Sequence, residues 1–178
     1  MSLLHSALAA SYPALYLFQR FRHYTTHNRS KRLRVLLYHD IAPEEQKYFE
    51  RQLAWLSNRW TFISPEHFAA YIKGEANIQN NSLLLTFDDG FSSNLEVAQK
   101  ILNPMGIQAL FFVVSDLVAI EDREEARQFI VRHVQPGLSM EKLPPYLNSM
   151  KWSDLELLLE QGHTIGAHTR SHARLSGI

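Results

Sequence analysis

The stretch Ser82-Leu83-Leu84-Leu85-Thr86-Phe87-Asp88-Asp89-Gly90 joins a largely apolar run to two carboxylates and a glycine. The run predicts a strand that is buried on both faces. On a regular strand Asp88 and Asp89 would point to opposite faces, but Gly90 permits a sharp turn, so both can face the same mouth. Because unpaired acids are costly to bury, the pair indicates a cation, a partner or solvent. Alone, the Asp-Asp-Gly sequence is equally typical of a loop that caps a helix.

On both sides of this stretch, short apolar runs alternate with segments of helical period. Further strands are predicted at 34–38, 62–63, 107–114 and 163–167. Helices are predicted over 44–60, from Ser64 to Gly74, around 95–102, and after a capping box at Ser153-Asp154-Leu155-Glu156. This alternation predicts an α/β fold, with a parallel sheet that is covered on both faces or closed as a barrel.

A second polar motif, His168-Thr169-Arg170-Ser171-His172, follows the last predicted strand. Histidines at positions i and i+4 share one face of a helical turn and can converge on one ion, although two solvated histidines would give the same pattern. The chain contains no cysteine, so any metal must bind to histidine and carboxylate. Two imidazoles and one carboxylate suit a divalent ion that keeps open positions for water. Both motifs follow apolar strands, where α/β enzymes build their active sites.

At these two motifs the chain resembles the polysaccharide deacetylase family with the NodB-type domain. Thr86 to Gly90 resembles the first motif of the family, and His168 to His172 resembles its second, a His-(Ser/Thr)-x-x-His pattern. The stretches 35–40, 106–113 and 162–167 resemble neighbouring strands of the family. The resemblance covers roughly residues 33–114 and 150–175, and it implies a distorted, incomplete (β/α) barrel.

The resemblance also implies roles for single residues. Asp88 would be the general base, and Asp89, His168 and His172 would bind a divalent ion, with zinc the first choice. The implied reaction is hydrolysis of the acetamide of an N-acetylglucosamine-type polysaccharide or oligosaccharide, in which Asp88 removes a proton from the attacking water. At the end of the first strand, His39 and Asp40 are candidates for lining the substrate mouth.

The chain departs from the family pattern after its second motif. The later motifs of the family supply an arginine that orients the base, an aromatic groove wall and a histidine that protonates the leaving amine, and residues 173–178 match none of these motifs. We therefore expect residues 33–178 to be a partial domain that has little or no deacetylase activity and self-associates through its open sheet. The alternative is a non-catalytic remnant that binds metal or glycan. The insertion at about 115–150 is either a lid over the sugar groove or a surface addition without a role in the chemistry.

Residues 1–32 form a basic and apolar leader. The first 39 residues contain six arginines and lysines and no acid. The apolar stretch from Leu3 to Phe18 is shorter than the ~20 residues of a spanning helix and lacks a positive segment before it, which disfavours a signal peptide. Residues 3–34 could make a peripheral membrane contact through which the protein acts, or the leader could be solvated or packed on the domain. A cytoplasmic or peripheral membrane location is favoured. The formal net charge of zero gives no reason to expect nucleic acid.

Overall fold

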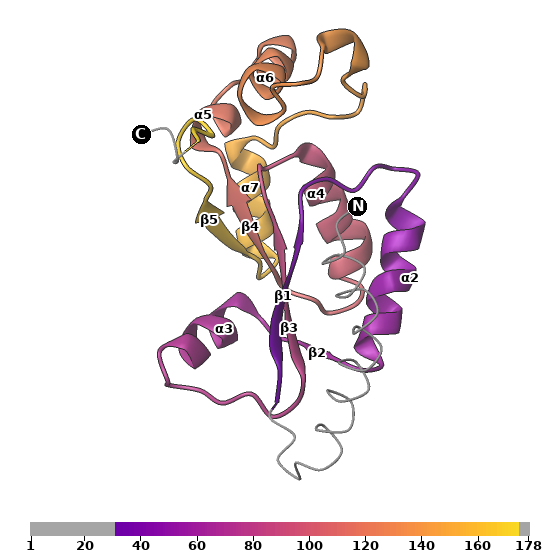
Figure 1. Ribbon diagram of the computed structural model, residues 1–178, viewed down its shortest axis with the longest axis vertical. Helices are drawn as coiled ribbons and strands as arrows, with labels where there is room; N and C mark the ends of the chain where they lie inside the picture. The colour runs from indigo at the N-terminus through magenta and orange to yellow at the C-terminus, as the bar shows by residue number, and fades with distance from the viewer. Residues whose placement is uncertain (1–30, 175–178) are drawn as a thin grey trace, which may run out of the picture. The chain divides into compact units, whose positions relative to one another are not determined.

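The structure, a computed structural model, describes residues 31–174, so the predictions for the leader lie almost entirely outside the described residues. Five parallel strands form one sheet in the order β1-β3-β4-β5, with β2 also beside β3. The strands are β1 (Leu33–Tyr38), β2 (Thr61–Phe62), β3 (Ser82–Phe87), β4 (Ala109–Val113) and β5 (Thr164–Ala167) (Figure 1). The predicted parallel α/β architecture is confirmed.

Strand β3 is the centre of the sheet, and all six of its residues are buried. On one side it pairs with β1 along its whole length, from Leu33 opposite Ser82 to Tyr38 opposite Phe87. On the other side β2 pairs with its first two residues, and β4 pairs with Leu85 to Phe87. Two short strands thus lie end to end along one edge of β3, which explains why its sequence is apolar almost throughout.

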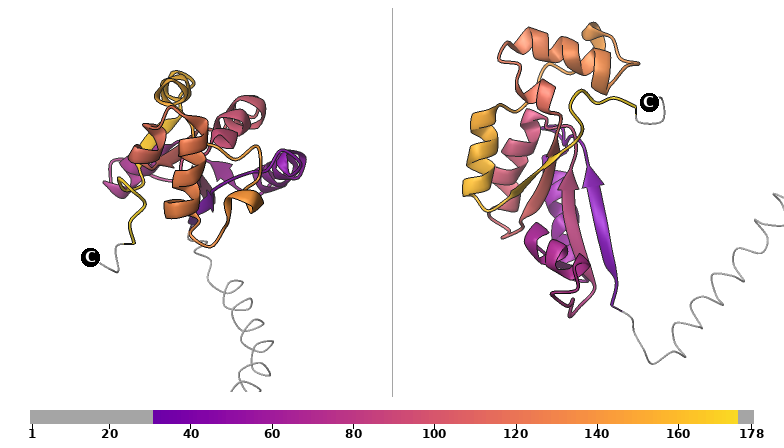
Figure 2. Two further views of the ribbon diagram at one scale, coloured as in Figure 1. Left: turned by 90° about the horizontal axis from the view of Figure 1, so that it is seen from above. Right: turned by 90° about the vertical axis from the view of Figure 1, so that its left-hand side faces the viewer.

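Three helical segments cover one face of the sheet. They are α2 (Gln46–Ser57), α4 (Ser92–Val97) with its π-helical continuation η1 (Ala98–Leu102), and α7 (Trp152–Glu160). Their buried side chains form the main core with residues of β3 and β4, among them Phe49, Leu53, Val97, Leu102, Leu158, Leu85, Phe87 and Phe111. Figure 2 shows these helices against the strands. Helix α3 (Pro65–Ile72) lies on the other face, where Thr164 donates a hydrogen bond to the Glu66 carboxylate at 2.7 Å.

On the sheet face that carries α3, the side chains of the central strand β3 are buried and those of β1 are exposed. Leu84 and Thr86 of β3 are buried, whereas their register partners Val35 and Leu37 on β1 are 52% and 49% exposed. Within residues 31–174, β1 pairs only with β3. One edge of the described sheet therefore presents apolar side chains and unpaired backbone groups together.

The start of helix α3 agrees with the prediction from the sequence, and the start of helix α7 does not. Helix α3 begins as predicted, because the Ser64 hydroxyl accepts a hydrogen bond from the His67 backbone N–H at 3.2 Å. The predicted capping box at Ser153 is wrong, because α7 already begins at Trp152. The Asp154 carboxylate reaches back one turn to accept the N–H of Lys151 at 2.8 Å. Ser153 therefore lies inside the first turn.

A buried histidine joins the helical layer to the sheet. The His163 Nδ1 atom accepts the backbone N–H of Ala109 at 3.1 Å, so its Nε2 carries the proton and donates to the Asn103 side-chain oxygen at 2.9 Å. Both ring nitrogens are satisfied only in the neutral form. Burial lowers the pKa of this imidazole, so His163 is a structural residue of the core.

The insertion folds as a small helical layer over the carboxyl ends of the strands (Figures 1 and 2). It contains α5 (Ser115–Val118), α6 (Arg123–Phe129), the π-helix η2 (Ile130–Val134) and the 3-10 helix η3 (Met140–Lys142). A second apolar cluster holds it together, formed by Phe91, Val114, Leu117, Ala126, Ile130, Leu143 and Leu147. Residues 123–134 are thus helical without a break. None of the helices described is long and apolar enough to cross a membrane.

Candidate metal centre

The first motif turns sharply where β3 ends. Asp89 has a φ of 73° and Gly90 a φ of 83°, so two consecutive residues adopt the left-handed conformation. Aspartate tolerates this conformation better than most side chains, and glycine adopts it freely. A Cβ atom at Gly90 would lie 3.1 Å from Cγ1 of Val113. The turn thus presses its backbone against β4 and places the Asp89 side chain, only 3% exposed, at the end of the sheet.

The second motif brings its two histidines together in a different way from the one predicted. Residues 168–172 form a loop and not a helical turn. Thr169 and His172 have φ values of 62° and 57°, and the Thr169 hydroxyl accepts the backbone N–H of His172 at 2.9 Å. The two left-handed residues fold the loop tightly, which leaves the imidazole centroids 5.3 Å apart. The prediction of a helical turn is wrong, although the rings still converge.

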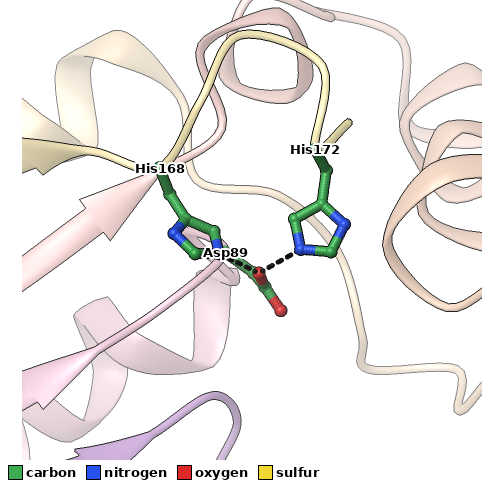
Figure 3. Close-up of side chains that lie close together, drawn as sticks. All are labelled: Asp89, His168 and His172. Atoms are coloured by element: carbon green, nitrogen blue, oxygen red, sulfur yellow. Dashed lines mark ion pairs between the residues drawn. The ribbon is translucent and has the colours of Figure 1, made fainter. Parts of the chain in front are cut away.

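The three predicted ligands meet at one point. The Nε2 atoms of His168 and His172 lie 3.5 Å and 3.4 Å from Oδ1 of Asp89, and both rings point toward this carboxylate (Figure 3). One ligand atom from each residue lies within 4.8 Å of the others. Oδ1 of Asp89 is buried and accepts no hydrogen bond. An orphaned carboxylate oxygen beside two imidazole nitrogens is a donor set that fits a divalent ion such as zinc.

The electrostatics of Asp89 agree with this fit. Burial raises the pKa of its carboxyl group, and the nearby imidazoles of His172, His39 and His168 offset this rise only in part. The charge of Asp88 adds to the rise in pKa. Since the protein groups do not fully compensate the buried carboxylate, a bound cation would supply the missing positive charge.

The other predicted site residues lie around the group of three. Asp88 is 8% exposed, and its backbone N–H donates to the Tyr38 carbonyl at 2.9 Å. His39 lies close enough to affect the Asp89 pKa. Asp40 accepts hydrogen bonds from the Ser93 hydroxyl at 2.5 Å and the Tyr146 hydroxyl at 2.9 Å. Asp40 thus ties the end of β1 to α4 and to the insertion. A role of His39 and Asp40 at the substrate mouth remains a prediction.

Two contacts from the insertion were not predicted. The His133 carbonyl lies 2.9 Å from Nδ1 of His172. Arg170 and Asp116 make both a side-chain ion pair and a backbone hydrogen bond, each at 3.0 Å, so the histidine loop is also tied to α5. His133 lies outside both sequence motifs. His133 contacts His172 through its backbone carbonyl, and a contact of this kind cannot be predicted from the type of side chain.

Comparison with known proteins identifies the family. The profile of the family described as Polysaccharide deacetylase matches residues 75–178, which is more than half of the chain. The chain belongs to the polysaccharide deacetylase family. Among curated proteins, YxkH of Bacillus subtilis (strain 168), named as a polysaccharide deacetylase, is 25% identical over 118 residues. That match covers 62% of this chain and 41% of YxkH.

Solved structures, two of the following three named as deacetylases, share the fold. IcaB from Ammonifex degensii matches with a TM-score of 0.60 and 23% identity over 78% of this chain and 53% of its own. The Streptococcus pyogenes deacetylase PplD, solved in complex with acetate, matches with a TM-score of 0.54 and 21% identity over 79% of this chain and 57% of its own. A de-N-acetylase from Aggregatibacter actinomycetemcomitans matches with a TM-score of 0.53 and 19% identity over 78% of this chain and 54% of its own. The chain thus spans about half the length of these relatives. The NodB-type partial barrel expected from the sequence is confirmed as the fold.

Proposed function

We propose that this chain carries the metal-binding part of a hydrolase that removes N-acetyl groups from an N-acetylglucosamine-type glycan. The observation that supports this most strongly is the convergence of Asp89, His168 and His172 on one point, with a buried Asp89 oxygen that lacks any hydrogen bond. Family membership supports an acetylated glycan as the substrate. The de-N-acetylase name of one structural relative favours an acetamide, and the acetate bound to another fits the product of removing an acetyl group.

The residues of this chain divide the work between binding and proton transfer. Asp89, His168 and His172 would hold the ion, with zinc as the first choice because it commonly takes imidazole and carboxylate ligands together. An ion held there supplies Lewis-acid polarisation of the acetamide carbonyl and a lowered pKa for water. Asp88 is adjacent in sequence but outside the ligand group, so it remains free to accept the proton of the attacking water.

The first test compares two aspartates that differ by one position. Asp89→Asn should weaken zinc binding, measured by calorimetry, because it replaces the charged ligand with a neutral amide. In a protein that also carries the later family motifs, Asp88→Asn should keep zinc affinity and lower the release of acetate from an N-acetylglucosamine oligomer by ~10²- to 10⁴-fold if Asp88 is the general base. Asp122→Asn is the matched control. Asp122 is the N-cap of α6 and is not a member of the candidate ligand group, and asparagine caps a helix equally well.

The outcomes separate the proposed function from its alternatives. Equal loss of zinc affinity in the Asp88 and Asp89 variants would refute the division between base and ligand. Zinc and glycan binding without acetate release, in a protein whose Asp88 is intact, would favour a non-catalytic binding module. Parallel assays with an O-acetylated xylan would show whether the scissile bond is an amide or an ester.

A further inference from the structure

The helical insertion contributes a backbone carbonyl to the candidate metal centre. Near the end of η2, the His133 carbonyl oxygen lies 2.9 Å from Nδ1 of His172. A carbonyl oxygen can only accept a hydrogen bond, so Nδ1 must carry the proton and donate it. In the neutral ring the lone pair then resides on Nε2. This is the nitrogen that lies 3.4 Å from Oδ1 of Asp89.

This arrangement cannot be a hydrogen bond between the neutral His172 ring and the ionised Asp89 carboxylate. Neither Nε2 nor the carboxylate oxygen has a proton to share, so the two lone pairs repel each other unless a cation lies between them. We propose that the insertion is a positioning element of the metal centre, in which the His133 carbonyl holds His172 in its Nδ1–H tautomer with Nε2 directed at the ion. The inference deepens the proposed metal-dependent function and rests on it.

The end of the helix leaves this carbonyl available. In an α-helix that continued past residue 137, the carbonyl of residue 133 would accept the N–H of residue 137. Here the N–H of Gly137 donates to the Gln135 carbonyl at 2.8 Å, and the N–H of Gln135 donates to the Ile130 carbonyl at 2.8 Å. The His133 carbonyl is therefore free to accept from the imidazole. It also lies at the negative end of the α6–η2 helix, which strengthens its attraction for an N–H donor.

A chain of polar contacts fixes the position of this helix. The Arg127 guanidinium donates to the carbonyls of Leu143, Pro144 and Leu147, at 3.1, 2.8 and 2.8 Å. The same loop carries Tyr146, whose hydroxyl donates to Asp40 at the end of β1. Arg127 thus connects the helix whose His133 carbonyl contacts His172 to the sheet at whose end Asp89 lies. A planar fork with several donors suits this task, because it binds several carbonyls in a fixed geometry.

The direct test is the tautomer of His172 in the metal-free 178-residue chain. Long-range proton–nitrogen correlation spectra of histidine-labelled protein, recorded where the ring is neutral, distinguish the two tautomers. We expect His172 to be Nδ1–H, although the Nε2–H form predominates in a free histidine side chain. His168 is the internal reference, because no described residue bonds its Nδ1. An Nε2–H or mixed His172 would overturn the proposal. This measurement needs neither metal nor turnover, so its failure is distinct from failure of the proposed function.

A second test loosens the helix without touching the ligands. Arg127→Met should let His172 return toward the Nε2–H form and raise the zinc Kd ~10- to 100-fold, the usual effect of losing a partner that orients a ligand. Arg132→Met is the control. Arg132 lies on η2, but it contacts Gln128 on its own helix at 3.4 Å. If Arg127→Met does not fold, Arg127→Lys keeps the charge and loses the fork, and the same changes are expected on a smaller scale. A folded Arg127 variant with an unchanged tautomer and zinc Kd would overturn the proposal.

Discussion

Replacing Gly90 with alanine should destabilise the fold by two separable effects. The φ of 83° is left-handed, which costs a non-glycine residue ~1–2 kcal/mol. The new Cβ would also lie 3.1 and 3.2 Å from the Cγ1 and Cβ atoms of Val113, closer than normal packing allows. Overpacking of this kind typically costs ~1–3 kcal/mol. The total expected loss in the free energy of unfolding is therefore ~2–5 kcal/mol.

Gly106 provides the control that separates the two effects. Its φ is 66°, but a Cβ there would meet nothing within 4 Å. Gly106→Ala should thus show the backbone cost alone, ~1–2 kcal/mol, and the difference between the two variants measures the contact with Val113. Urea unfolding of the metal-free protein, followed by tryptophan fluorescence, gives both values. Equal losses in the two variants would refute the argument that the turn presses against β4.

The same substitution should reach the metal centre through β4. The Val113 carbonyl accepts the backbone N–H of His168 at 2.8 Å. If Val113 moves to make room for the new methyl group, His168 moves with it, so the zinc affinity of Gly90→Ala should fall. Adding Val113→Ala should restore part of this affinity, because it removes the Cγ1 atom that the new Cβ would meet at 3.1 Å. Unchanged zinc affinity in Gly90→Ala would show that the site tolerates the shift.

Three further measurements test other parts of the structure. Because burial lowers the pKa of His163 below its ordinary value of 6.5, the unfolded chain protonates first as the pH falls. The free energy of unfolding should therefore decrease from pH 6.5 down to the folded pKa, and His163→Gln should flatten this decrease in urea midpoints. Light scattering should show self-association that the double substitution Val35→Thr and Leu37→Thr reduces. The control Ile72→Thr, at a more exposed residue away from β1, should not reduce it, and a monomeric wild-type chain would contradict the prediction. Tyr146→Phe should lower the free energy of unfolding by ~1–3 kcal/mol, since it leaves a half-buried Asp40 oxygen without its donor, and an unchanged melting temperature would show that the bond is unimportant.

The parts of the fold that sequence patterns predicted are those that depend on local chemistry. Strand β3 was recognisable because it is buried on both faces, and α3 because Ser64, Pro65 and Gly74 mark its ends. The capping of α7 was misplaced by two residues, because Asp154 can bond a backbone N–H one turn back without help from Ser153.

The site was predictable in its members and not in its geometry. Ligand types and their positions after strands pointed to Asp89, His168 and His172, but the left-handed loop that joins the histidines leaves no periodic signal. The bond between Tyr146 and Asp40 spans 106 residues of sequence, and the His133 contact involves only backbone oxygen on that side. Such contacts depend on how separate elements pack, which single residues do not encode.

Because η2 is a π-helical turn, the position of the His133 carbonyl depends more on the number of residues in this segment than on which residues they are. A π turn holds about one residue more than the 3.6 of an α turn. Losing one residue from 130–134 would restore the regular helix and rotate everything after it by about 100° relative to everything before it. Sequence changes on the exposed side of this helix can accumulate freely, whereas a single deletion would turn a different carbonyl toward His172. During divergence, this segment should therefore drift in sequence while keeping its residue count.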